Sequence, residues 1–130
     1  MIVMKFGGTS VEDAAAMKTM CDIVRMRAKK KPVVVLSAVS GSTNTLIRCA
    51  ELAAGGQEPE AQALLKTRII DRHFEIIQGL INGLREQDGL IREVNGFFDE
   101  LRHLLYGISI TGDLSPRVLD FVMSYGERMS

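Results

Sequence analysis

Two short apolar runs near the N-terminus, with a helical pattern between them, constrain the fold of this chain more than any other feature. The runs are residues 2–6 (IVMKF) and 33–36 (VVVL), and both contain β-branched residues that favour strands. Between them, apolar residues recur three and four positions apart on one helical face: Ala14, Met17, Cys21, Val24 and Ala28. The order strand, helix, strand predicts a βαβ unit with parallel strands and a right-handed crossover.

The ends of this first helix carry their own signals. Ser10, with Asp13 three residues later, matches a capping box, so we expect the helix to begin at about Ser10. The lysines at 29–31 and then Pro32 indicate its C-terminal end, where cations are favourable and proline cannot continue the helix. The run 33–36 has no polar residue, which predicts a strand buried on both faces.

Apolar residues recur at helical spacing in four later stretches, which predict four more helices. The expected ranges are about 44–54, 59–84, 90–106 and 116–130. We expect Gly107 to cap the third of these and Ser115 with Pro116 to begin the fourth. The stretch 108–115 is expected to be a connector that contains a short extended piece.

The pattern as a whole predicts an α/β fold class that starts with a βαβ unit and continues with several helices. A buried parallel sheet needs more strands than the two found here, and the last helical pattern runs to residue 130 without a cap. We therefore expect the chain to be the first part of a larger α/β domain. The alternative is a compact helical domain with a small sheet.

Composition excludes several classes of partner. The chain has 130 residues, with 16 basic and 16 acidic side chains, so no net field favours nucleic acid or an anionic membrane. No apolar run approaches the length of a membrane span. The two cysteines have no metal-ligand or disulfide spacing, and two buried free thiols favour a cytoplasmic protein.

The segment after the first strand, KFGGTS, has two interpretations. A strand that leads through Gly7 and Gly8 into a helix exposes backbone N–H groups to an anion, and Lys5 adds a positive charge. Thr9 and Ser10 add hydroxyl groups. The other interpretation is a tight turn with a capped helix. The spacing matches neither the Walker P-loop nor the dinucleotide-binding motif, so the segment alone does not decide.

Polar residues also follow the second strand, in the segment SAVSGSTN. Ser37 and Thr43 belong to this segment and offer hydroxyl groups without charge, which suits a small polar metabolite. Open α/β sheets bind ligands beyond the carboxyl ends of their strands, where this segment should lie. An ordinary Ser/Thr loop with an N-cap is the alternative.

A third segment, SYGERMS, lies near residue 130. Asp120, Ser124 and Glu127 recur at helical spacing and should share one face of the last helix. If that face borders a cleft, Glu127 can hold a cationic amine; otherwise the face is solvated. The histidines, His73 and His103, have no partner at metal-ligand spacing, so no metal site is expected.

Taken in order, MKFGGTSV, VVVLSAVSGSTN and SYGERMS resemble the N-terminal part of the aspartate kinases, in the amino-acid kinase family. The resemblance covers residues 1–130 and rests on three motifs in the right order and spacing. It implies a three-layer α/β/α fold and ATP-dependent phosphorylation of the side-chain carboxylate of L-aspartate to 4-phospho-L-aspartate. That reaction is the first step toward lysine, threonine, methionine and isoleucine.

The resemblance also implies roles for individual residues. Positions that match the phosphate-binding residues of the family are Lys5, Gly7, Gly8, Thr9 and Ser10. Positions that match its aspartate-binding residues are Ser37, Thr43 and Glu127. Lys5 matches the catalytic lysine, which stabilises charge on the transferring phosphoryl group. Mg²⁺ is expected to accompany ATP, without protein ligands in this segment.

Members of the family continue well beyond this length, often into ACT domains or a fused homoserine dehydrogenase. The resemblance therefore implies that residues 1–130 are the truncated N-terminal part of a catalytic domain, inactive alone and homo-oligomeric in the full-length enzyme. Two alternatives stay open. One is a family member with a different acceptor, such as acetylglutamate, glutamate, carbamate or a nucleoside monophosphate. The other is a non-catalytic interaction or regulatory module.

Overall fold

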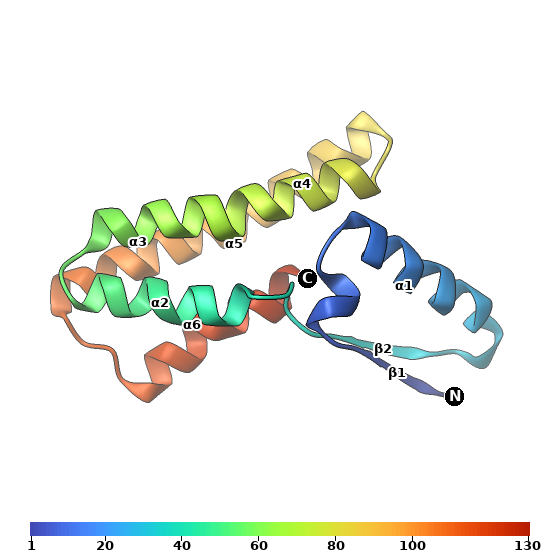
Figure 1. Ribbon diagram of the computed structural model, residues 1–130, viewed down its shortest axis with the longest axis horizontal. Helices are drawn as coiled ribbons and strands as arrows, with labels where there is room; N and C mark the ends of the chain where they lie inside the picture. The colour runs from blue at the N-terminus through green and yellow to red at the C-terminus, as the bar shows by residue number, and fades with distance from the viewer.

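The computed structural model describes residues 1–130 and begins with the expected βαβ unit. Strand β1 (Val3–Phe6) and strand β2 (Val33–Leu36) pair in parallel, with Val3 opposite Val33 and Phe6 opposite Leu36. Helix α1 (Ala14–Met26) connects them and lies along one side of the strands (Figure 1). The α/β class and the βαβ start are therefore confirmed.

Five further α-helices follow β2 and pack on one another (Figure 1). Their bounds are α2 Ser42–Ala54, α3 Glu58–Leu65, α4 Asp71–Leu80, α5 Leu84–Thr111 and α6 Pro116–Met129. Short helical turns occupy Gly8–Val11 (η1), Ala28–Lys30 (η2) and Lys66–Ile70 (η3). The last helix begins as expected, because the Ser115 side chain accepts a hydrogen bond from the Val118 N–H at 3.3 Å. No helix of the chain is both long enough and apolar enough to cross a membrane.

The expected start of α1 and end of α5 are wrong. Ser10 lies in the turn η1, and Asp13 is the residue that caps α1, accepting a hydrogen bond from the Ala16 N–H at 2.7 Å. Gly107 lies inside α5, which continues through the expected connector to Thr111. Gly112, at φ 65°, ends the helix instead, in a left-handed conformation that glycine adopts without strain.

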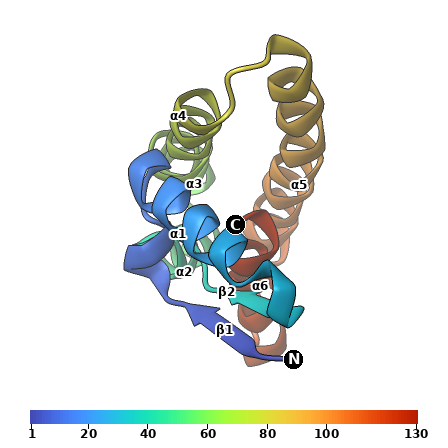
Figure 2. The same ribbon diagram turned by 90° about the vertical axis from the view of Figure 1, so that its right-hand side faces the viewer.

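The main hydrophobic core lies between α2, α3, α4, α5 and α6. Its largest fully buried side chains include Phe98, Leu46, Leu65, Ile69 and Leu101. A second, smaller cluster joins the sheet and α1 to α4, and its buried members are Val11, Met17, Val39 and Ile76. Figure 2 shows α1 beside α4, so α4 connects the βαβ unit to the helical part.

Strand β2 is not buried on both faces, which corrects the expectation from its apolar sequence. Val33 is 47% exposed and Val35 is 43% exposed; the paired residue Val3 on β1 is 68% exposed. These side chains share the face of the sheet that α1 does not cover, because residues two apart on a strand point the same way. Within residues 1–130, neither a further strand nor a second helical layer covers this face.

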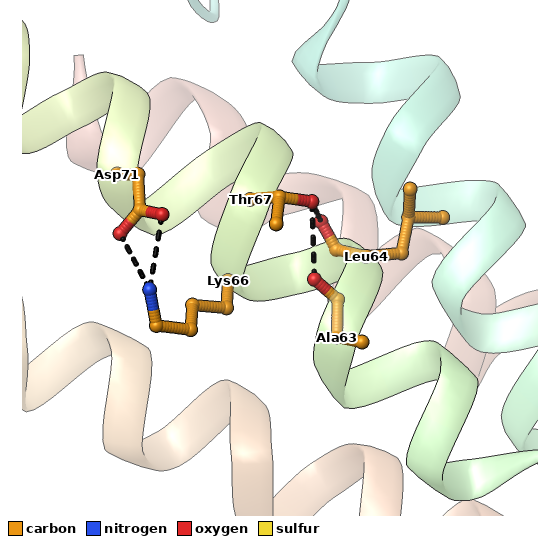
Figure 3. Close-up of polar contacts among 5 residues, drawn as sticks. All are labelled: Ala63, Leu64, Lys66, Thr67 and Asp71. Atoms are coloured by element: carbon orange, nitrogen blue, oxygen red, sulfur yellow. Dashed lines mark hydrogen bonds and ion pairs between the residues drawn. The ribbon is translucent and has the colours of Figure 1, made fainter.

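Helices α3 and α4 form one continuous run joined by η3, which is a π-helical turn (Figure 3). Polar contacts brace this turn. The Thr67 hydroxyl donates to the Ala63 carbonyl at 3.1 Å, and Lys66 Nζ lies 3.0 Å from Asp71 Oδ2. A π turn holds one more residue than an α turn, and here it brings both Ile69 and Ile70 into the core. The run ends at Leu80, short of the expected residue 84.

His73, on α4, is buried and gives the fold a dependence on pH. Its Nδ1–H donates to the Ile69 carbonyl at 2.6 Å, and Nε2 is buried without a partner. Burial lowers the pKa of His73, the hydrogen bond to Ile69 opposes this, and the charge of Arg72 lowers the pKa further. The folded protein therefore takes up a proton on His73 only at a lower pH than the unfolded chain does.

We expect the free energy of unfolding to decrease as the pH falls below about 6.5, the ordinary histidine pKa, by up to about 1.4 kcal/mol per pH unit. The loss should end below the folded pKa of His73. Urea unfolding between pH 7.5 and 5.5 measures this slope, which His73→Gln should reduce. His103→Gln, at an exposed position on α5, is the control and should keep the wild-type slope. An unchanged slope in His73→Gln would contradict the assignment.

Candidate active site

A cleft of about 390 Å³ opens beyond the carboxyl ends of β1 and β2. Gly8 and Thr9, from the segment after β1, form one part of its wall. The loop 37–41 after β2 and the first turn of α2 form another part, and Glu127 of α6 completes it. Parallel strands place their following loops at the same edge of the sheet, so segments far apart in the sequence meet here.

The segments after the two strands pack tightly. A Cβ atom on Gly8 would lie 3.2 Å from the Ala38 carbonyl oxygen and 3.4 Å from the Ser40 Cα. Only a residue without a side chain fits at this contact without displacing backbone. Gly8 therefore allows the two segments to form one continuous wall.

The N-terminus of α2 forms part of the cleft and has no side-chain cap. Gly41, at φ 81°, precedes the helix and offers no side-chain oxygen. The backbone N–H groups of Thr43 and Asn44 are therefore left without a partner in the chain, and both residues line the cleft. Free N–H groups and the positive end of the helix dipole favour an anion at this wall.

Glu127 reaches the cleft because α6 packs closely against the loop after β2. A Cβ atom on Gly126 would lie 2.9 Å from the Ala38 Cβ and 3.5 Å from Leu46 Cδ1. The absence of a side chain at Gly126 therefore allows this approach. Glu127 itself is exposed, with its carboxylate free of salt bridges and hydrogen bonds. It is the only acidic residue in the cleft wall.

The neighbouring residue, Arg128, fixes the last turn of α6 to α5. Its guanidinium lies 5.0 Å from the ring centre of Phe97 and 4.5 Å from that of Tyr125. The Tyr125 hydroxyl donates to Glu100 Oε2 at 2.8 Å. Burial and the Glu100 carboxylate raise the pKa of Tyr125. This arrangement holds Tyr125 and Arg128 of α6 against α5, while Glu127 faces the cleft.

Comparison with known proteins identifies the family. All of residues 1–130 match the model of the amino acid kinase family. The chain belongs to the amino acid kinase family. It is 35% identical over 134 residues to the lysine-sensitive aspartokinase 3 of Escherichia coli, covering 99% of this chain and 26% of that protein. It is 33% identical over 129 residues to the chloroplastic aspartokinase 1 of Arabidopsis thaliana, covering 98% of this chain and 21% of that protein.

Solved structures agree with this assignment to the family. The crystal structure of E. coli aspartokinase III with lysine and aspartate, in its T-state, matches 99% of this chain with a TM-score of 0.79 at 33% identity. The same enzyme with aspartate and ADP, in its R-state, matches with a TM-score of 0.69 at 34% identity. The chain spans about a quarter of that protein, 26% of its length. The fold is thus an N-terminal portion of the amino acid kinase fold.

In this member of the amino acid kinase family, the cleft contains five of the residues that the sequence singles out. They are Gly8, Thr9, Ser37, Thr43 and Glu127. Gly7 and Ser10 lie beside the cleft, in the same segment as Gly8 but outside its wall. Lys5 lies on the exposed face of β1 and makes no salt bridge or hydrogen bond. The roles of all these residues stay predictions.

The three α6 residues that are expected to share one face line two different hollows. Glu127 lines the cleft, whereas Asp120 and Ser124 line a separate hollow beside Leu104 and Phe121. Seven positions span almost two helical turns, so side chains at both ends of this spacing contact different neighbours. Asp120 and Ser124 are therefore not part of the cleft.

Two residues that shape the cleft are not predicted from the sequence. Gly126 is an isolated glycine in an amphipathic helix, a pattern that can indicate close packing. Arg72 carries no sequence signal, since it is one of many charged residues on a helix. It is half-buried and hydrogen-bonds to both cleft segments.

The cleft has the donors and acceptors to bind a small amphoteric molecule. The uncapped start of α2 attracts an anionic group, and the Glu127 carboxylate attracts a cationic one. Hydroxyl groups of Ser37 and Thr43 supply uncharged hydrogen bonds. The chain contains no cluster of three or more metal-ligating side chains.

Proposed function

We propose that residues 1–130 form the N-terminal part of an aspartokinase catalytic domain. The full-length protein, in which this segment is continued, would transfer the γ-phosphoryl group of ATP to the side-chain carboxylate of L-aspartate. One observation carries the proposal: a single cleft combines an uncapped helix N-terminus with one unpaired carboxylate. The aspartokinase relatives, and the E. coli enzyme solved with aspartate and ADP, support it.

The aspartate side of the site is proposed to use Glu127, Ser37 and Thr43. The Glu127 carboxylate pairs with the α-amino group of aspartate, since it is the only acidic side chain in the wall. The two hydroxyls donate hydrogen bonds to a substrate carboxylate near the start of α2. An amino acid with two carboxylates and one amine matches this distribution of charge.

The phosphate side is proposed to use the segment after β1. Backbone N–H groups of Gly7, Gly8 and Thr9 contact the phosphates of ATP, because glycines let the backbone approach an anion closely. Ser10 contributes its hydroxyl, since its own N–H donates to the Gly7 carbonyl at 3.0 Å. Lys5, which has no partner in the chain, supplies a positive charge to the transferring group. The two substrates would meet between this segment and the loop 37–41.

The proposed reaction requires little proton transfer by the protein. An aspartate carboxylate is ionised at neutral pH and can attack phosphorus directly. Catalysis then consists mainly of positioning and charge stabilisation. Mg²⁺ would neutralise phosphate charge, but the hydroxyls and single carboxylate of this cleft do not form a metal-ligand set. We propose that the ion is held by ATP and by residues outside this segment.

The aspartokinase relatives are longer than this chain, which spans 21% to 26% of their lengths. We propose that the segment alone is inactive and that the full-length enzyme is a homo-oligomer. A cytoplasmic location is also proposed. It is supported by the free thiols of Cys21 and Cys49, although Cys21 is only half-buried.

Replacement of Glu127 by glutamine tests the function directly. In the full-length protein we expect the aspartate KM to rise about 10- to 100-fold, the effect of losing a hydrogen bond to a charged group worth about 1.5–3 kcal/mol. The kcat and the KM for ATP should change little. Initial rates of ADP release at varied aspartate and varied ATP provide these constants.

Asp120→Asn is the matched control, because Asp120 is an exposed acidic residue of the same helix outside the cleft. It should keep wild-type constants. A panel of acceptors completes the test. Phosphorylation of glutamate, acetylglutamate, carbamate or a nucleoside monophosphate without phosphorylation of aspartate would overturn the proposed function.

A further inference from the structure

Arg72, on α4, connects the two segments that form the cleft. Its Nη1 donates to the Ser40 carbonyl at 2.6 Å, and its Nη2 donates to the Glu12 carbonyl at 3.1 Å. Ser40 belongs to the loop after β2, and Glu12 directly follows the turn that starts at Gly8. One planar group thus contacts the backbone of both segments, at residues 32 and 60 positions away in sequence.

The guanidinium is held by these carbonyls and not by a carboxylate. Glu12, Asp13 and Glu75 border the same open hollow as Arg72, yet Arg72 makes no salt bridge. A guanidinium offers five N–H donors in a rigid plane, so it can reach two carbonyls at once. A lysine has a single flexible ammonium group and would not hold both at fixed positions.

Arg72 contacts the loop next to Gly41, where the backbone has a left-handed conformation. A Cβ atom on Gly41, at φ 81°, would lie 3.8 Å from Arg72 Nη1, so the guanidinium packs directly against this turn. The Ser40 carbonyl shares its peptide unit with the Gly41 N–H. A charged donor on that carbonyl polarises the unit and strengthens its N–H as a donor.

We propose that Arg72 is a positioning residue for phosphoryl transfer, which holds the segment after β1 and the loop after β2 at a fixed separation. The inference rests on the proposed function, in which the first segment binds ATP phosphates and the second binds aspartate. Each substrate would still bind to its own segment without Arg72. Their reacting atoms would no longer meet at the correct distance, because a displacement of about 1 Å can lower the rate about 100-fold.

The test compares Arg72→Gln, Arg72→Lys and Arg68→Gln in the full-length enzyme. Arg68 is the matched control, an exposed arginine in the preceding turn of the same helical run without a salt bridge. We expect Arg72→Gln to lower kcat about 10- to 100-fold, with both KM values within about threefold of wild type. Arg72→Lys should recover part of kcat, and Arg68→Gln should match wild type.

Hydrogen exchange measured by mass spectrometry on the same proteins provides a readout without activity. Arg72→Gln should speed exchange in peptides that cover residues 8–13 and 37–44 together, while the α5 core keeps its protection. A wild-type kcat in Arg72→Gln, or an equal loss in Arg68→Gln, would overturn the inference. A loss of kcat accompanied by faster hydrogen exchange throughout the protein would also overturn the inference. If the wild-type enzyme has no aspartate kinase activity, the proposed function fails, and exchange alone decides whether Arg72 joins the segments.

Discussion

Replacing Lys5 with alanine in the full-length protein should lower kcat for aspartate phosphorylation about 100- to 1,000-fold, the effect of removing one group that stabilises transition-state charge. Lys5 lies two residues before Gly7, near the carboxyl end of β1, and has no ionic partner in the chain. Its charge is therefore available to a phosphoryl group at that edge. The KM for aspartate should stay within about threefold, since Lys5 lies outside the proposed aspartate side.

The experiment needs a control for charge and one for folding. Lys18→Ala removes an exposed lysine from α1, away from the cleft, and should leave kcat unchanged. Lys5→Arg keeps the charge but changes its shape, so it should retain more activity than Lys5→Ala. Circular dichroism of each variant verifies that it is folded. If folded Lys5→Ala turned over at the wild-type rate, Lys5 would not be the catalytic lysine.

Replacing Phe98 with alanine should give the largest loss of stability, about 3–5 kcal/mol in the free energy of unfolding. Phe98 is fully buried in the helical core and packs edge-on against the rings of His73 at 5.8 Å and Phe74 at 5.7 Å. Truncation leaves a cavity between α4 and α5 and removes both ring contacts. A protein with a typical stability of about 5–15 kcal/mol would lose a large part of it.

Phe121→Ala is the matched control for this change. Phe121 is 51% exposed on α6 and makes a single edge-on contact with Tyr125 at 5.5 Å. Its loss should lower stability by about 1 kcal/mol, the scale of one aromatic pair. Urea unfolding followed by circular dichroism measures both variants. Equal losses for Phe98 and Phe121 would contradict the described core.

The start of the fold could be predicted because its signals are local. Residues 2–6 and 33–36 are apolar runs at the correct distance for a crossover helix, and the βαβ unit follows from them. The end of α5 could not be predicted in this way. Gly107 and Gly112 are both plausible caps in sequence, and the helix passes the first because Ile108, directly after it, is buried at 3% exposure in the core. Tertiary packing decided between them.

The cleft was predictable to the same extent. Gly8, Ser37 and Thr43 follow strand ends, where the topology of an α/β sheet predicts a ligand site. The family resemblance predicts a role for Glu127, whereas helical spacing alone favours a solvated face. Arg72 could not be found, because its partners lie 32 and 60 residues away and are backbone carbonyls without sequence identity.

The π turn at Lys66–Ile70 also affects which changes of length this protein can accept during evolution. An i→i+5 turn holds one residue more than an i→i+4 turn. Deleting one residue there converts the turn to regular α-helix and leaves the helices on both sides facing as before. A deletion elsewhere in α4 would rotate every later side chain by about 100° around the helix axis. Orthologues that differ in length by one residue between α3 and α4 should therefore have gained or lost it within this turn.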